Sequence, residues 1–136
     1  MLAVSAGVHP RKARVLVVDA EPLCRWALQE ALTPAGFDVV EMSPDPPFPP
    51  VDGVDVLVLD ATLAGAASLR ILEHVRARNP RCRVLLLTAF DSVGLARLST
   101  SSAVWRAIQK PFELPAVVEA VSELSGHAVP AAARLQ

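Results

Sequence analysis

Cysteine, net charge and long apolar runs are what this sequence has little of. Its two cysteines, Cys24 and Cys82, lie far apart and come without a Cys-x-x-Cys pair or a histidine cluster. This pattern argues against a structural zinc site. It indicates reduced thiols that pack as small apolar side chains in a cytoplasmic protein.

Charge of one sign is also lacking, because thirteen basic residues stand against fourteen acidic ones, for a net charge of −1. Such a balance offers no electrostatic footprint for nucleic acid or an anionic membrane. No apolar run approaches the ~18 residues that cross a bilayer. The first basic residues follow a short apolar stretch, the reverse of a secretory signal. We therefore expect a cytoplasmic chain that by itself binds neither nucleic acid nor membrane.

The composition fits one folded domain. The chain has 136 residues, of which 52% are hydrophobic and 20% charged. That is enough to bury a single core. We expect residues 1–13 to form an N-terminal extension, residues 14–126 the domain, and residues 127–136 a C-terminal tail or linker.

Short apolar runs alternate with segments of helical spacing. Several of the runs are nearly continuous, which is typical of parallel strands buried on both faces. Strands are predicted at 15–19, 37–42, 54–60, 83–88 and 103–109. Helices are predicted at 21–36, 68–79 and 113–126, with a weaker one at 91–102. This alternation predicts an α/β domain, a doubly wound five-stranded parallel sheet.

The buried sides and the ends of the helices can be predicted from the sequence. In residues 68–79, Leu69, Leu72 and Val75 are expected on one side, and Gly126 is a candidate C-terminal cap. Trp26 and Trp105 are interpreted as packing residues. His9, His74 and His127 are interpreted as surface residues.

Residues 43–50, SPDPPFPP, break the alternation with five prolines in eight positions. Each proline inside a helix would cost ~3 kcal/mol, so this connection must be extended. The sequence thus predicts a proline-rich loop in place of the second helix, with Phe48 and Val51 turned inward. A docking motif for a polyproline-binding module is the alternative.

Polar residues close or follow four of the strands. They are Asp19, Asp60, Thr88 and Lys110. In an open parallel sheet the carboxyl ends of the strands meet at one edge, so these side chains should converge there. Simpler interpretations remain for two of them. Asp19 could be a helix N-cap, and Thr88 an ordinary strand residue.

Four segments at these positions resemble a known family. In order, VLVVDAEPL, VLVLDATLAG, VLLLTAF and IQKPFEL resemble the receiver domain of two-component response regulators, over about residues 14 to 125. The resemblance implies a flavodoxin-like, CheY-like fold with strand order 2-1-3-4-5 and a role in phosphorelay signalling rather than an enzyme activity.

The resemblance also implies residue roles. Asp60 would accept a phosphoryl group from a sensor histidine kinase or phosphotransfer protein. Asp19, Asp60 and the backbone carbonyl of Thr62 would hold Mg²⁺. Thr88 and Lys110 would contact the phosphoryl oxygens.

The chain departs from the family at the metal site. Where the family usually has two adjacent acids after the first strand, this chain has Asp19 and Ala20. Losing a ligand charge should weaken Mg²⁺ binding. Glu21 would compensate only if the loop bends.

Other departures affect the loops and the switch. Ala107 stands three positions before the lysine, where the family commonly has an aromatic switch residue, and Trp105 lies two residues earlier. Ala64 and Ser68 replace the proline and glycine common after the phosphoacceptor. These differences leave open an atypical receiver that works as a protein-interaction module without phosphorylation.

Two further interpretations concern enzyme class and assembly. The Asp19-x-Glu21 motif faintly resembles the Asp-x-Asp of haloacid-dehalogenase-like phosphatases, a remote alternative. In the receiver family, partners often dock on the face of the fourth helix, fifth strand and fifth helix, which allows a homodimer. That face is expected to include Leu95, Leu98, Val117 and Val121. No helix-turn-helix or catalytic module follows residue 126, so any output is expected outside this chain.

Overall fold

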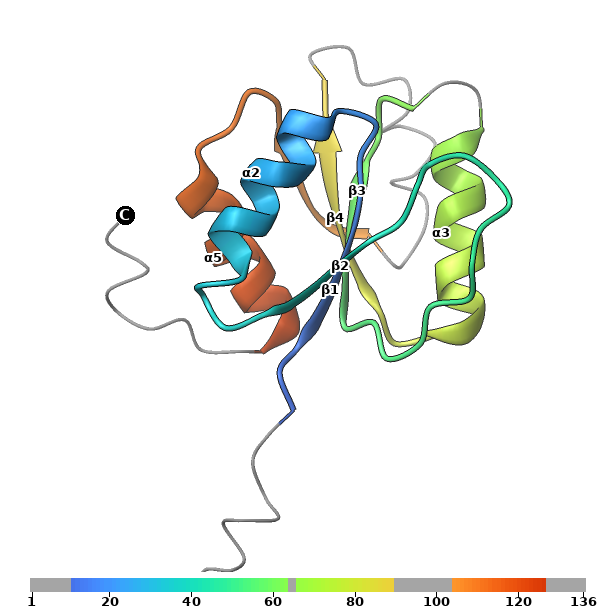
Figure 1. Ribbon diagram of the computed structural model, residues 1–136, viewed down its shortest axis with the longest axis horizontal. Coiled ribbons are helices and arrows are strands. Elements are labelled where there is room, and N and C mark those ends of the chain that lie inside the picture. The colour runs from blue at the N-terminus through green and yellow to red at the C-terminus, as the bar shows by residue number, and fades with distance from the viewer. Residues whose placement is uncertain (1–10, 64–65, 90–103, 127–136) are drawn as a thin grey trace, which may run out of the picture.

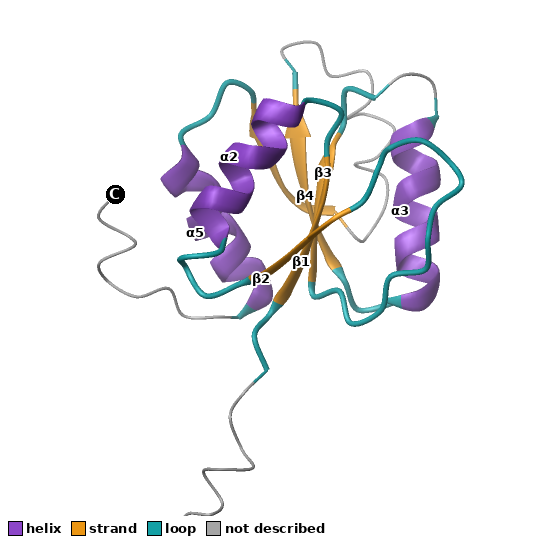
Figure 2. Cartoon of the chain, in the orientation of Figure 1, coloured by secondary structure: helices purple, strands orange, loops and turns teal. Residues whose placement is uncertain are grey.

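A computed structural model describes residues 11–63, 66–89 and 104–126, and the side chains of Val104 and Trp105 are not among the features described. These residues form a parallel sheet with helices on both faces (Figures 1 and 2). The strands are β1 (Arg14–Val18), β2 (Asp38–Glu41), β3 (Val56–Asp60), β4 (Arg83–Thr88) and β5 (Val104–Gln109). The helices are α2 (Pro22–Leu32), α3 (Ala67–Arg78) and α5 (Leu114–Ser125). The weaker helix predicted at 91–102 lies outside the described residues.

The sheet has five parallel strands in the order β2-β1-β3-β4-β5. This confirms the predicted α/β class and strand order. Helices α2 and α5 cover one face of the sheet and α3 covers the other (Figure 1). Every residue of β3 is buried, as the continuous apolar run predicts for a strand covered on both faces.

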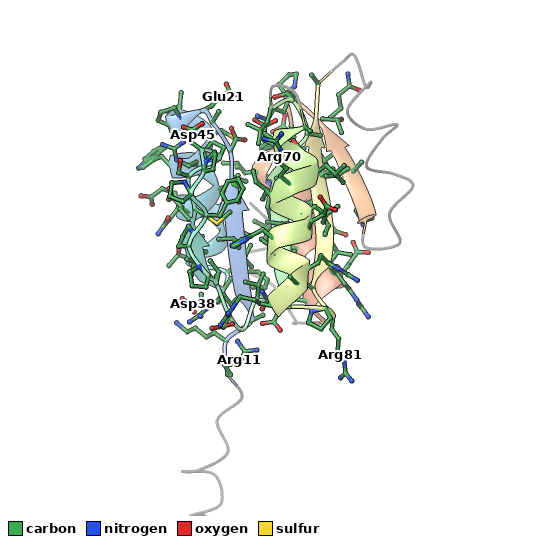
Figure 3. All side chains as sticks on the ribbon, turned by 90° about the vertical axis from the view of Figure 1, so that its right-hand side faces the viewer. Arg11, Glu21, Asp38, Asp45, Arg70 and Arg81 are labelled. Carbon is green, nitrogen blue, oxygen red and sulfur yellow. The ribbon has the colours of Figure 1, made fainter. Side chains whose placement is uncertain are left out.

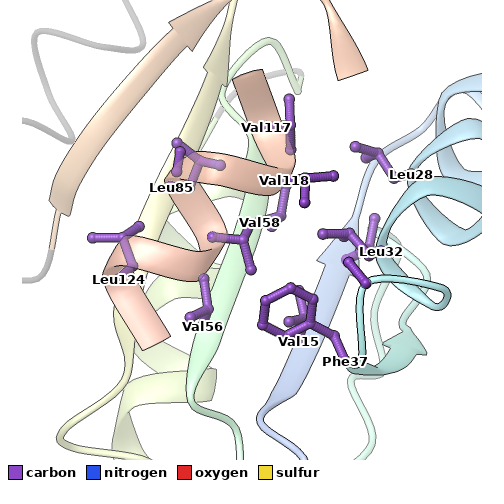
Figure 4. Packing of buried hydrophobic residues seen from close by; sticks show 14 of the residues in the cluster. Val15, Leu28, Leu32, Phe37, Val56, Val58, Leu85, Val117, Val118 and Leu124 are labelled. Atoms are coloured by element: carbon purple, nitrogen blue, oxygen red, sulfur yellow. The ribbon is translucent and has the colours of Figure 1, made fainter. Parts of the chain in front are cut away.

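Side chains of alternate strand residues form two separate cores. Val15 and Val17 of β1 belong to the cluster under α2 and α5, where Phe37 packs between strand and helix (Figure 4). Leu16 and Val18 point to the other face, into the cluster under α3. The period-two alternation of a strand therefore divides one apolar run between two layers.

Two predictions about individual side chains are wrong. In α3 the buried stripe consists of Ser68, Ile71, Leu72 and Val75, while Leu69 is 39% exposed. A strict three-residue spacing drifts backwards around a helix of 3.6 residues per turn, so Leu69 falls outside the buried side. Trp26 is not a packing residue, because it is 61% exposed. It lies on the side of α2 opposite the buried Leu28 and Leu32.

Helix ends follow the sequence signals. Pro22 and Pro115 lie in the first turns of α2 and α5, where the missing N–H of proline has no intrahelical partner to lose. Gly126 caps α5 in the left-handed region, with φ 71°, as predicted.

Residues 42–55 hold neither helix nor strand, so the proline-rich loop replaces the helix as predicted. Phe48 and Val51 pack against the cluster under α3, which confirms the expected inward side chains. His74 of α3 is half-buried rather than free on the surface. Its ring centroid lies 5.4 Å from that of Phe48, and its Nε2 is 2.8 Å from the carbonyl oxygen of Pro49.

Asn79, at the end of α3, holds the loop in place. Its Oδ1 accepts a hydrogen bond of 2.9 Å from the Val54 N–H, and its Nδ2 donates one of 2.7 Å to the Val51 carbonyl. Asn79 is itself buried, so these bonds form away from water. The extended connection is therefore fixed by specific polar contacts as well as by apolar packing.

The expected partner face needs correction on the fifth helix. Val117 and Val121 are fully buried in the core under α2 and α5, so neither is available to a partner. Leu95 and Leu98 lie outside the described residues. Among the residues described, no helix is long and apolar enough to cross a membrane.

Candidate functional site

The site lies at the carboxyl edge of the sheet, where β1 and β3 are neighbours. Asp19 and Asp60 follow or end these strands, and both carboxyl groups are buried. Asp19 Oδ1 accepts a hydrogen bond of 2.8 Å from the Glu21 N–H. The N-cap of α2 is Glu21, so the interpretation of Asp19 as the helix cap is wrong. Its carboxylate is instead directed at the sheet edge.

Asp60 is held by the segment that follows it. Its Oδ1 accepts two hydrogen bonds from Thr62, one of 2.8 Å from the backbone N–H and one of 2.6 Å from the hydroxyl. The Ser68 hydroxyl donates to the Asp60 carbonyl at 2.9 Å. The second carboxylate oxygen, Oδ2, faces Lys110. The two oxygens therefore differ, since Oδ1 is held by hydrogen bonds of Thr62, whereas Oδ2 lies 3.6 Å from the charge of Lys110.

Lys110 brings a cation to this acidic site. Its Nζ lies 2.9 Å from Asp19 Oδ2, 2.7 Å from Glu21 Oε1 and 3.6 Å from Asp60 Oδ2. Burial alone lowers the pKa of Lys110, but the hydrogen bonds to Glu21 and Asp19 and the charge of Asp60 outweigh it. They raise the pKa above its usual range, so the side chain stays a cation.

The main chain fixes Lys110 beside Thr88. The Lys110 N–H donates to the Thr88 carbonyl at 2.7 Å, which continues the pairing of β4 and β5 by one residue. The buried Thr88 hydroxyl lies 3.4 Å from the Ile108 carbonyl oxygen. Asp60 pairs in register with Leu87, so Thr88 is the next residue on the neighbouring strand. All four residues predicted from the strand ends thus gather at one edge.

Glu21 belongs to the same cluster. Oxygens from Asp19, Glu21 and Asp60 lie within 4.8 Å of one another. The loop bends so that a Glu21 carboxylate oxygen joins this cluster, which is the condition that the sequence sets for Glu21 to compensate for Ala20. Carboxylate oxygens are the hard donors that Mg²⁺ prefers, so the donor set fits this ion. Glu21 stands at the upper edge of the molecule in Figure 3.

Arg25 supports the site, and sequence reasoning missed it. Its Nη1 donates to the Asp19 carbonyl at 2.7 Å, and its Nε lies 3.3 Å from a Glu41 carboxylate oxygen. One side chain thereby ties the end of β1 to the end of β2. Its position one helical turn after Glu21 was the available signal, because residues four apart share one side of a helix.

A cavity of about 650 Å³ opens beside this cluster. It lies where the proline-rich loop leaves β2. Its lining consists of Ala20, Arg25, Glu41, Met42, Ser43, Pro44, Asp45, Leu63 and Ala67. Ala20, the residue that stands in place of the second acid, forms part of the cavity wall.

Cys24 lies beneath the site on α2. Burial raises the pKa of its thiol to about 12, and the hydrogen bond and charge of Asp19 act in the same direction. The thiol is therefore protonated at neutral pH and is not a nucleophile. Cys24 and Cys82 are both free, in agreement with the sequence interpretation.

Comparison with known proteins identifies the class of domain to which this fold belongs. The response regulator receiver domain family matches residues 15–122, so the chain belongs to this family. A cyclic di-GMP phosphodiesterase of Thermotoga maritima is 28% identical over 101 residues, which cover 74% of this chain and 27% of that protein. The DNA-binding transcriptional regulator NtrC of Klebsiella pneumoniae is 26% identical over 116 residues, covering 82% and 24%.

Solved structures show the same fold. A response regulator from Thermotoga maritima has a TM-score of 0.68 at 24% identity, covering 85% of this chain and 99% of that chain. A CheY-like receiver domain protein from Methanospirillum hungatei has a TM-score of 0.71 at 16% identity, covering 85% and 95%. The chain spans about a quarter of the length of the two curated relatives above.

Proposed function

We propose that Asp60 accepts a phosphoryl group from the phosphohistidine of a sensor histidine kinase or phosphotransfer protein. The observation that carries this proposal is the position of Asp60 Oδ2, which faces the Lys110 ammonium at 3.6 Å beside the buried Asp19. In the transfer, Oδ2 forms the new bond to phosphorus. The bond from phosphorus to the histidine nitrogen breaks, and its electron pair stays on that nitrogen.

Other residues of the site serve this transfer. Asp19, Glu21 and Asp60, with the backbone carbonyl of Thr62, would hold Mg²⁺, which when bound neutralises negative charge around the transferred group. Lys110 supplies a fixed positive charge for a phosphoryl oxygen, and the Thr88 hydroxyl supplies a hydrogen bond. Ser68 keeps the Asp60 main chain in place.

The departures from the family limit how the signal leaves the site. Ala107 is exposed on β5 and has no ring to rotate, so we expect a change in the chain after phosphorylation to begin at Thr88 and Lys110. Lacking an acid at Ala20, the site depends on Glu21, which is mostly exposed. We expect weaker Mg²⁺ binding than a site with two buried acids would give.

A second candidate is an interaction module that works without phosphorylation. Ala20 and Ala107 favour it, together with the close pairing of Lys110 with Asp19 and Glu21. The phosphatase alternative has no comparable support. The carboxylate of Glu21 pairs with Lys110, and the chain belongs to the receiver family. We propose a signalling domain rather than an enzyme.

The comparisons support a proposal about the partner more strongly than one about the output. The matched relatives are named for different activities, a phosphodiesterase and a DNA-binding regulator, while the match covers about a quarter of each. The similarity to these relatives therefore supports acceptance of a phosphoryl group, but it does not favour any particular output activity. A homodimer through Val117 and Val121 is not proposed, because both side chains belong to the core.

The test uses acetyl phosphate and beryllofluoride, each with millimolar Mg²⁺. The intact mass should increase by one phosphoryl group with acetyl phosphate, and amide resonances around Thr88 and Lys110 should shift with either reagent. Asp60→Asn should abolish both responses. Asp45→Asn, which removes an exposed acid at the same end of the molecule, should keep them. An unchanged mass and unchanged spectra in the wild-type chain would favour the interaction module.

A further inference from the structure

Lys110 and a divalent cation would need the same carboxylates. The ammonium is closer to Asp19 and Glu21, at 2.9 and 2.7 Å, than to Asp60, at 3.6 Å. Asp19 and Glu21 also supply two of the three oxygens in the acidic cluster. The structure thus shows one cation, the ammonium of Lys110, already bound by the residues that would bind the other.

Glu21 is the member of the cluster that can exchange partners. Its side chain is 66% exposed, whereas Asp19 is fully buried and held by the Glu21 N–H and by Lys110. An exposed ion pair holds its partners weakly, because water competes for both charges. Glu21 can therefore turn from the ammonium without leaving a buried charge unpaired.

We propose that Glu21 exchanges Lys110 for the divalent cation, so that cation binding frees the ammonium to pair with the oxygens on Asp60. In the structure Glu21 and Asp19 hold the Lys110 ammonium closer to themselves than to Asp60. When the cation binds Asp19, Glu21 and one oxygen of Asp60, the ammonium can pair with the other Asp60 oxygen or with a group bound to it. The inference rests on the proposed function. In it, metal binding is the step that frees the Lys110 ammonium to pair with the oxygens on Asp60.

Thermodynamic linkage predicts the direction in which each variant should change the Mg²⁺ affinity. Two cations that compete for the same ligands weaken each other equally. Removing the ammonium should therefore strengthen Mg²⁺ binding, and removing the carboxylate of Glu21 should weaken it. If Glu21 were only a surface partner of Lys110, Glu21→Gln would leave Mg²⁺ affinity unchanged.

The chain allows a clean measurement, since it contains only two lysines, Lys12 and Lys110. In protein labelled with ¹³C at lysine Cε, Mg²⁺ should shift the Lys110 signal and leave the exposed Lys12 signal in place. The midpoint of the shift should equal the Mg²⁺ dissociation constant from calorimetry. No phosphodonor is present in this experiment.

Variants test whether Glu21 exchanges Lys110 for the cation or is only a surface partner of Lys110. Glu21→Gln should weaken Mg²⁺ binding about tenfold, and Lys110→Met should tighten it about tenfold. Glu30→Gln, an exposed acid at the far end of α2, should change neither the affinity nor the lysine signals. Ala20→Asp should restore tight binding in the Glu21→Gln background. Circular dichroism checks that each variant is folded. If Lys110→Met does not fold, the Mg²⁺ affinity of Glu21→Gln alone tests the exchange.

Three results would overturn the exchange: no calorimetric Mg²⁺ binding, unchanged affinity in Glu21→Gln, or a Lys110 signal that stays fixed while Mg²⁺ binds. The intact-mass experiment separates this failure from that of the proposed function. If Asp60 is phosphorylated while Glu21→Gln binds Mg²⁺ like the wild type, only the exchange is wrong. If the lysine signal responds as expected and Asp60 takes no phosphoryl group, only the phosphoacceptor role is wrong.

Discussion

Lys110 and Asp19, 91 positions apart in the sequence, are joined by a contact of 2.9 Å at the carboxyl edge of the sheet. Asp19 is fully buried, and the Lys110 side chain is only 17% exposed. Asp60, also buried, has a carboxylate oxygen 3.6 Å from the same ammonium. One lysine therefore compensates two buried acids, and the stability of the fold depends on the residues of its site.

Lys110→Met should destabilise the protein by about 3 kcal/mol, because it leaves two buried carboxylates facing each other without a cation. Urea unfolding without divalent ions measures the change. Lys12→Met, at an exposed lysine, is the control and should alter stability by less than about 0.5 kcal/mol. Equal unfolding midpoints for the two variants would contradict the buried compensation.

Asn79→Ala should cost about 3 kcal/mol, because it leaves the Val54 N–H and the Val51 carbonyl without their bonds to the side chain. The matched variant is Asp52→Asn. It weakens the exposed pair with Arg78, whose shorter contact is 2.7 Å, and should cost much less than Asn79→Ala because water screens that pair. Thermal unfolding of both variants tests whether the loop is held mainly by Asn79. A small effect of Asn79→Ala would show that apolar packing is sufficient.

Val121→Ala should destabilise the monomer by about 2 kcal/mol through the cavity it leaves in the core. Trp26→Ala, at an exposed side chain, should change stability by less than about 0.5 kcal/mol. Chemical unfolding together with sedimentation distinguishes a core residue from an interface residue. A Val121→Ala protein of normal stability but altered oligomeric state would contradict the burial described above.

Alkylation of Cys24 by iodoacetamide should stay slow well above neutral pH. Burial and Asp19 raise the pKa of its thiol to about 12, so the reactive thiolate forms only in strongly alkaline solution. In urea-unfolded protein the rate should instead rise around the ordinary thiol pKa, about 8.5. Mass spectrometry of the Cys24 peptide follows both reactions. A native rate that rises near pH 8.5 would be the contrary result.

The same shift has a consequence for stability. The pKa of Cys24 is higher in the folded than in the unfolded state, so its contribution is fully present below the unfolded pKa. It is lost as pH rises from about 8.5 toward about 12. Lys110 adds a loss of the same sign above its unfolded pKa, about 10.4.

The sequence predicted the sheet and the convergence of the site because both depend on strands. A run such as residues 56–59 is apolar throughout, which is typical of a strand covered on both faces. Once the strands are parallel, the residues that end them must share an edge. Asp19, Asp60, Thr88 and Lys110 then meet without further information.

The side chains that were misplaced depend on angles and loop paths that a linear pattern does not contain. Leu69 and Trp26 are apolar residues on helices, and small errors of phase put them on the buried side. Val117 and Val121 were assigned to a partner face by family resemblance, although their own helical spacing fits a core stripe. The approach of Glu21 depends on the path of the chain after Asp19, and only coordinates reveal such a path.

The prolines of residues 43–50 also affect stability through the entropy of the denatured chain. Proline restricts the backbone in the denatured chain as well as in the native one, and each compatible proline is worth about 0.4–1 kcal/mol for this reason. Residues 43–50 therefore lose little freedom when the protein folds. A helix here would have begun from a far more mobile segment. The crossover is thus made rigid in advance by its covalent chemistry, and side chains such as Phe48 need cover only part of the sheet.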